Sequence, residues 1–188
     1  MVNILNPDNY LCVKETSVIP RNNIENIIIR EARIEDVDII SNIVNIAYDL
    51  GEDIKRKKQP RTNSNALAQA ILSENQILWK AIAVCGSTER IIGSVLFETT
   101  YDWEKHRENG GNYGSGITKT HEDNIVGLDD KFSYMGMLSV EPYYQKLGVG
   151  KLLMKHCEKE TLKAGHKRMV LCFLSCQKHL KRMYMKAG

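Results

Sequence analysis

The 188-residue sequence lacks several features that would assign it to a particular class of protein. It has no apolar run of about 18 residues, so we expect no membrane-spanning helix and no membrane partner. Its first 23 residues lack a basic start followed by an apolar block, so no secretory signal peptide is expected. The net charge of +3 is too small to indicate a nucleic-acid partner. These absences favour a cytoplasmic globular protein.

Paired cysteines are also lacking. The five cysteines are odd in number, scattered, and form no Cys-x-x-Cys pair. Cys172 and Cys176 are four residues apart but straddle the end of an expected strand, so buried thiols are expected there rather than ligands. Neither cysteines nor histidines have the spacing of a metal site, and no metal is predicted. A reducing intracellular compartment fits this pattern.

Hydrophobic periodicity predicts one domain over residues 24–188, preceded by an N-terminal extension over 1–23. Apolar runs predict strands over 26–32, 77–85, 91–99, 132–140 and 169–174. Helices are predicted over 35–48, over 64–74 with Ser64 as the cap, over 148–164, and around Leu180 to Ala187. The order predicts an α/β (α+β) fold, in which an antiparallel half built on a hairpin joins a parallel β-α-β crossover.

The stretch QKLGVG follows the fourth expected strand and opens directly into a helix. A P-loop does not fit, because Gln145 stands at its first glycine and Leu152 at its hydroxyl position. A dinucleotide-binding turn does not fit, because its third glycine would fall on Leu153. The remaining template is Gln-x-x-Gly-x-Gly, which the stretch matches completely.

Such a turn suits a pyrophosphate. A helix N-terminus leaves its first amides unbonded and carries about half a positive charge. Gly148 and Gly150 would let that backbone approach a ligand closely, and Lys146 and Lys151 would add cationic groups. The alternative is a plain strand-to-helix turn with solvated lysines.

The pattern resembles the acetyl-CoA-binding segment of the GNAT superfamily of N-acyltransferases. That family places [QR]xxGx[GA] after a strand that ends in a V-x-P-like turn. Four landmarks match in the family's order, over roughly residues 27–188: Ile29–Ala32 with the Asp36 helix, Arg90–Gly93, Met137–Gly150 and Tyr184–Gly188. The resemblance implies a GNAT fold and an N-acetyltransferase that uses acetyl-CoA on a primary amine of a small molecule or peptide.

The resemblance also implies site residues. Coenzyme A would contact Leu138, Val140, Gln145, Lys146, Leu147, Gly148, Val149, Gly150, Lys151 and Gln177. The Leu138 amide would face the thioester oxygen, and the Tyr184 hydroxyl would protonate the departing thiolate. Tyr184 also lies on the apolar face of its helix, so a plain core role is the alternative.

The general base is less clearly marked. Tyr134 occupies the position where some relatives carry a catalytic carboxylate, but a tyrosine is a poor base near neutral pH. Glu98, near the end of the preceding strand, is our first candidate, acting through water. His106 and His121, in the long glycine-rich loop over 102–130, have suitable intrinsic pKa values. The same loop is expected to help select the acceptor.

The sequence departs from the family at its end. It stops at Gly188, where a final strand pair usually follows, so the strand over 169–174 would be an apolar edge. Either the sequence is a truncated form, or a neighbouring chain, as in a homodimer, or the N-terminal extension covers this edge. Gln177 stands where many relatives have asparagine. The basic run Lys55 to Arg61 is interpreted as a solvated loop, with attraction of an acidic acceptor as the alternative. The rivals to an enzyme are a non-catalytic acyl-CoA sensor and a structural subunit without ligand binding.

Overall fold

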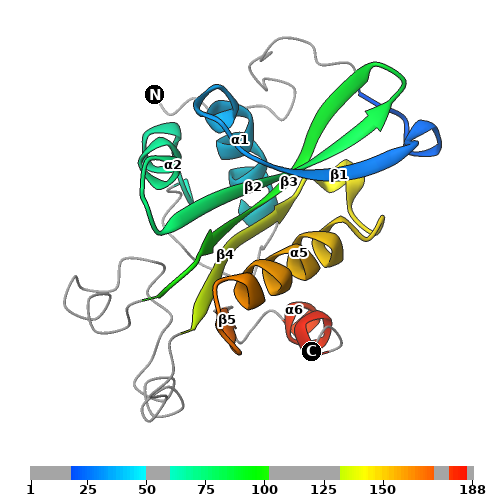
Figure 1. The fold of residues 1–188 in the computed structure, drawn as a ribbon. Helices are drawn as coiled ribbons and strands as arrows, with labels where there is room; N and C mark the ends of the chain where they lie inside the picture. Colours follow the sequence, from blue (N-terminus) through cyan, green and yellow to red (C-terminus); the bar gives the residue numbers. More distant parts are fainter. Residues whose placement is uncertain (1–17, 50–59, 102–131, 172–177, 186–188) are drawn as a thin grey trace, which may run out of the picture.

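The computed structural model describes residues 18–49, 60–101, 132–171 and 178–185, which build a five-stranded sheet with helices on both faces (Figure 1). The strands lie in the order β1-β2-β3-β4-β5, with bounds Asn26–Glu31, Gln76–Cys85, Thr88–Glu98, Ser133–Val140 and Met169–Leu171. The first four strands are antiparallel, and β5 pairs with β4 in parallel. This is the mixed sheet predicted from the sequence, and the predicted fold is confirmed.

The helices divide between the two faces of the sheet. On one face lie α1 (Val37–Asp49) and α2 (Ser64–Ile71), and on the other lie α5 (Val149–Lys163) and α6 (Lys178–Met185) (Figure 1). Three 3-10 turns complete the described part: η1 (Arg21–Asn23), η2 (Ile34–Asp36) and η3 (Pro142–Tyr144). No described helix combines the length and apolarity needed to cross a bilayer.

Each face of the sheet has its own core. Leu96 packs with α1 and α2, whereas its neighbours Val95 and Phe97 pack with α5. This split follows from the alternation of side chains along a strand. The apolar stripe of α5, with Leu153 and Cys157, is fully buried. Burying a large aliphatic side chain contributes about 1.5–3 kcal/mol to folding stability, so this stripe fixes α5 firmly to the sheet.

Two details differ from the sequence expectations. The cap of α2 is Asn63, not Ser64, because the Asn63 side chain accepts the Ala66 amide at 2.9 Å while the Ser64 hydroxyl bonds Asp38 on α1. The helix ends at Ile71 rather than at residue 74. The hairpin between β2 and β3 is tighter than expected, since Cys85 pairs with Thr88 and Gly86 supplies a positive φ of 56°.

The segment before β1 packs against the domain. Ile19 is buried, and its amide donates to the Tyr144 hydroxyl at 3.1 Å while that hydroxyl donates to the Ile19 carbonyl at 3.0 Å. The Arg21 side chain bonds the backbone carbonyls of Tyr143 and Gln145. These contacts attach the segment to the turn that leads into α5. The domain boundary at residue 24 stays a prediction.

Candidate functional site

A β-bulge interrupts β4 at its centre. Ser94 of β3 pairs with Ser139, but Leu96 pairs with Gly136, so the single residue between them on β3 faces two residues on β4. One of those two, Met137, has a φ of +50°, which is uncommon for a side chain of this size. Such a bulge bends a strand and redirects its backbone groups.

Beyond the bulge, the backbone groups of β4 alternate between β3 and the opposite edge of the strand. The Glu141 amide donates to the Ile92 carbonyl of β3 at 2.9 Å. Because backbone groups alternate between the two edges of a strand, those of Val140 and Leu138 point to the other edge. In the described residues the pairing of β4 with β5 reaches only to Met135. Among the described residues no strand pairs with the edge next to Leu138 and Val140, and the Gln145 side chain donates to the Val140 carbonyl at 3.3 Å.

The glycine turn follows directly. Lys146 and Gly148 have φ angles of +65° and +83°, and Gly148 is the N-cap of α5. The Leu152 amide makes the first helical bond, to the Gly148 carbonyl at 3.0 Å. The amides of residues 149–151 thus have no acceptor within the helix, as expected at a helix N-terminus.

The space around the two glycines tests whether a ligand fits. A Cβ atom at Gly148 would meet no atom within 4 Å, and one at Gly150 would meet only Val140 Cγ2, at 3.9 Å. The positive φ at Gly148 accounts for glycine there. Packing within the protein does not account for glycine at residue 150. A pyrophosphate lying against the helix N-terminus would account for it, so the turn fits the diphosphate of a nucleotide-like cofactor.

An ion pair braces this turn from the other side of the sheet. The Arg90 guanidinium lies 3.0 Å from the Glu141 carboxylate, and both side chains are mostly buried. Arg90 also lies 5.9 Å from the centre of the Tyr144 ring in η3. The start of β3 is thereby linked to the residues that connect β4 with α5.

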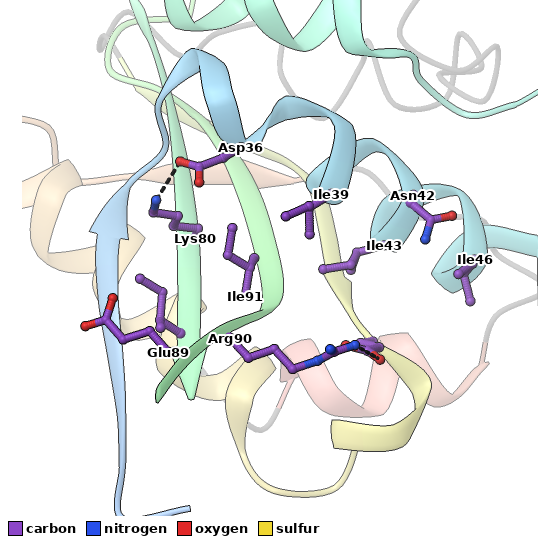
Figure 2. A pocket seen from close by; sticks show the side chains of 11 residues that line it. Asp36, Ile39, Asn42, Ile43, Ile46, Lys80, Glu89, Arg90 and Ile91 are labelled. Carbon is purple, nitrogen blue, oxygen red and sulfur yellow. Dashed lines mark hydrogen bonds and ion pairs between the residues drawn. The ribbon is translucent and has the colours of Figure 1, made fainter. Parts of the chain in front are cut away.

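A pocket of about 320 Å³ lies between α1 and the hairpin of β2 and β3 (Figure 2). Isoleucines from α1 and from both strands line it, together with charged side chains near its rim. Those charges have partners: Asp36 bonds Lys80, Glu89 bonds Arg30, and Glu141 bonds Arg90. Asp36, a landmark of the sequence pattern, thus ties β2 to the turn that leads into α1, whereas Arg90 ties β3 to the residue that follows β4.

Tyr184 on α6 packs against the core cluster that includes Leu138 and Val140. Burial raises the pKa of Tyr184 well above its ordinary value, and the charge of Tyr48 raises it further. Its hydroxyl therefore stays protonated at physiological pH. Tyr48 belongs to α1, so the two tyrosines come from helices on opposite faces of the sheet (Figure 1).

The ring of Tyr48 also contacts an arginine. The Arg61 guanidinium lies 5.2 Å from the centre of the Tyr48 ring. Arg61 is half-buried, which corrects the expectation of a solvated loop at this residue, and its buried Nε atom has no hydrogen-bond partner. Sequence reasoning missed Tyr48, and no signal in the sequence linked it to Tyr184.

Glu98 lies at the end of β3, opposite Tyr134 of β4. Burial raises the pKa of Glu98, and a hydrogen bond from Gln76 partly opposes this effect. One carboxylate oxygen, Oε1, is buried without a hydrogen-bond partner. Glu98 shares a strand face with Leu96 and thus lies on the α1 side of the sheet, two residue pairs from the bulge.

Some of the predicted site residues cannot be located. Gln177, His106 and His121 lie outside the described residues, as do Cys172, Cys176 and the loop over 102–130. Among the residues that are described, no three His, Cys, Asp or Glu side chains gather as metal ligands would.

A sequence profile described as "Acetyltransferase (GNAT) family" matches residues 52–188. No curated protein matches the chain. Solved structures of bacterial proteins share its fold at low sequence identity, and three of them illustrate the likeness.

A tetramutant of the BH1408 protein from Bacillus halodurans has a TM-score of 0.60 at 16% identity, over 86% of this chain and 92% of that one. The GCN5-related N-acetyltransferase from Ralstonia eutropha has 0.55 at 16% identity, over 85% and 91%. The yncA protein from Salmonella typhimurium, solved with its cofactor acetyl-CoA, has 0.58 at 18% identity, over 86% and 78%.

Proposed function

Since the chain belongs to the acetyltransferase (GNAT) family, we propose that it transfers the acetyl group of acetyl-CoA to a primary amine. The observation that carries the proposal is the continuity of two features. The bulge lies next to Leu138, on an edge of β4 that no described strand pairs beyond Met135, and the same strand leads within ten residues to the amides at the start of α5. A long ligand with amides at one end and a diphosphate at the other matches both.

The backbone would provide most of the binding. The free amides of residues 149–151 would bind the diphosphate, with Lys146 and Lys151 nearby as exposed cations. The open edge of β4 would pair with the pantetheine amides as an added strand does. The Gln145 side chain would then release the Val140 carbonyl. Acetyl-CoA supplies the activated acetyl thioester.

Groups of the protein would stabilise the negative charge on the thioester oxygen and transfer the protons of the reaction. The Leu138 amide would donate a hydrogen bond to the carbonyl oxygen as that oxygen gains negative charge, a contribution of about 2.7–4 kcal/mol per donor. The C–N bond forms and the C–S bond breaks. The amine loses a proton to a base, and the Tyr184 hydroxyl gives its proton to the leaving sulfur. The raised pKa of Tyr184 suits this role, because the proton is present at neutral pH.

Glu98 is the base that we propose. Its raised pKa brings it closer to neutrality, where a base transfers protons most effectively. The unpartnered Oε1 atom would accept a hydrogen bond from water. Two residues along a strand span about 7 Å, so one or two waters would connect Glu98 with an amine placed at the bulge.

Two measurements test the proposal. Calorimetric titration of the folded chain with CoA should give saturable heat, and the heat should fall sharply with pantetheine alone, which lacks the diphosphate. Release of CoA thiol from acetyl-CoA should accelerate when primary amines are added. Binding without release for any amine would identify a non-catalytic acyl-CoA sensor, and the absence of binding would refute the proposal entirely.

A further inference from the structure

We propose that Arg61 binds a carboxylate of the acceptor, so that the preferred acceptors are amines that carry an acidic group a few bonds from the nitrogen. This inference rests on the proposed acetyl transfer and specifies its substrate class. It comes from a cluster of three side chains, Arg61, Tyr48 and Tyr184, that the fold gathers from the segment before α2, from α1 and from α6.

The position of Arg61 is fixed by its neighbour. The Thr62 amide donates to the Asn45 side-chain oxygen at 3.1 Å, and the Asn45 side-chain nitrogen donates to the Thr62 carbonyl at 3.0 Å. Asn45 and Tyr48 are three residues apart on α1, and therefore lie on the same side of the helix. The paired bonds hold the chain beside α1 where Arg61 reaches the Tyr48 ring, 5.2 Å away.

Arg61 lacks the partner that comparable cations have. Lys80 and Arg90, two mostly buried cations at the pocket beside α1, each have a carboxylate within 3.0 Å. Arg61 makes no ion pair with any described residue, and its Nε atom is shielded from solvent without an acceptor. A buried donor without an acceptor destabilises the folded protein, and more so when the donor is charged. A ligand that supplies two carboxylate oxygens would remove this cost, because the guanidinium group binds carboxylates through two parallel hydrogen bonds.

The cluster places this cation next to the proposed chemistry. Tyr48 contacts Arg61 through its ring and influences the pKa of Tyr184. Tyr184 is the proposed proton donor to the leaving sulfur. An acceptor whose carboxylate binds Arg61 would thus have its amine on the side of the cluster where Tyr184 lies. The candidates are free amino acids and peptides with an acidic first residue, in which a carboxylate lies a few bonds from the amine.

The test compares matched acceptors. Free amino acids are assayed against their own carboxamides, which keep the amine and side chain but lack the anion. A second comparison uses C-terminally amidated dipeptides that begin with aspartate or asparagine, and it separates a free amino acid from an acidic peptide as the source of the carboxylate. The readout is kcat and KM for CoA release, in the wild type and in Arg61→Gln, Arg61→Lys and Arg168→Gln. Arg168 is an exposed arginine before β5 and serves as the control.

In one of the two comparisons, amino acids against carboxamides or aspartyl against asparaginyl dipeptides, we expect the wild type to prefer the anionic acceptor. The preference should be at least about tenfold in kcat/KM, which corresponds to about 1.4 kcal/mol. Arg61→Gln should remove this preference through KM, with kcat little changed, because it deletes a binding contact and not a proton donor. Arg61→Lys should keep part of the preference, and Arg168→Gln all of it. Amino acids and their carboxamides differ in amine basicity, and this difference cancels when the acid-to-amide ratio of a variant is divided by that of the wild type.

The outcomes separate this inference from the proposed function. Equal losses for anionic and neutral acceptors in Arg61→Gln, or a wild type without a preference, would overturn the role of Arg61 while acetyl transfer stands. A wild type that binds CoA but acetylates no amine would refute both. Thermal melting and CoA titration of each variant show whether it is folded, and Arg61→Lys provides a second variant if Arg61→Gln does not fold.

Discussion

The proposed cofactor end and the proposed acceptor end of the site are built in different ways. The cofactor end is a continuous stretch from Leu138 to Lys151, and the groups that it offers are backbone amides. The acceptor end combines side chains from α1, from α6 and from the segment before α2. Backbone amides keep their function when most side chains change, whereas a side-chain cluster changes with each substitution. We therefore expect the cofactor end to be general and the acceptor end to determine specificity.

The two ends also differ in electrostatics. Beside the cofactor turn, Arg90 and Glu141 neutralise each other, and such a pair braces structure. At the acceptor end, Arg61 has no described carboxylate partner, and burial raises the pKa of Tyr184. Perturbed or unpaired groups are characteristic of sites that act on a substrate. The comparison predicts that substitutions at the acceptor end change kcat or the KM for the amine, and that substitutions at the cofactor end change CoA affinity.

The largest expected effect comes from Tyr184→Phe. Removing a positioned general acid lowers kcat by about 10²–10⁴-fold. The phenylalanine ring keeps the apolar contacts of Tyr184 with the core, so thermal stability and CoA affinity should change little. Thiol-release assays measure kcat, thermal melting measures stability, and calorimetry measures CoA affinity. The control is Tyr48→Phe, which removes the neighbouring hydroxyl but keeps the ring under Arg61. A core role alone would leave kcat of Tyr184→Phe equal to that of the wild type.

Glu98→Gln should remove an ionisation from the pH profile. In the wild type, the base must be deprotonated, so kcat/KM should fall as pH drops through the raised pKa of Glu98. In the variant, that acidic limb should vanish and the rate at neutral pH should fall by about 10²-fold or more. An unchanged profile would exclude Glu98 as the base.

The same substitution has a second consequence for stability. Because burial raises the pKa of Glu98, the ionised carboxylate destabilises the folded state, and that cost develops as pH rises through the folded-state pKa. Glu98→Gln should therefore unfold at the same or a higher temperature at neutral pH. Loss of activity together with unchanged or increased stability would mark Glu98 as a functional residue.

The sequence predicted the glycine turn and the helix after it far better than the contacts around Arg61, and the construction of the two regions explains why. The glycine turn is local, so Gly148 and the start of α5 were assigned from contiguous residues. The bulge at Met137 was not foreseen, because it depends on the pairing register with β3. Arg61 and Tyr48 meet because Asn45 binds Thr62, a contact across a segment between two helices that periodicity does not encode.

Gly150→Ala should separate stability from binding at the cofactor end. Alanine stabilises a helix by up to about 1 kcal/mol relative to glycine, and the space for its Cβ atom is open. The protein should melt at the same or a higher temperature. The same Cβ atom would occupy the space needed by the diphosphate, so CoA affinity should fall about tenfold, or about 1.4 kcal/mol. Lys159→Ala, further along α5, is the control and should leave CoA affinity unchanged. Unchanged affinity in Gly150→Ala would mean that the ligand does not approach this residue.

The smallest expected effect is that of the brace between Arg90 and Glu141. Because both side chains retain some exposure, solvent screens the pair, and we expect each of Arg90→Gln and Glu141→Gln to cost about 1–2 kcal/mol of folding free energy. Arg90 also contacts the Tyr144 ring, so its loss should loosen η3 and weaken CoA binding a few-fold without changing kcat. Chemical denaturation of both single variants and of the double variant gives the coupling energy of the pair. If the pair only braces the turn, the two substitutions will be non-additive in stability and will weaken CoA binding together. A selective loss of kcat in Arg90→Gln would instead place Arg90 at the acceptor end, and would contradict the separation between residues that bind CoA and residues that act on the acceptor.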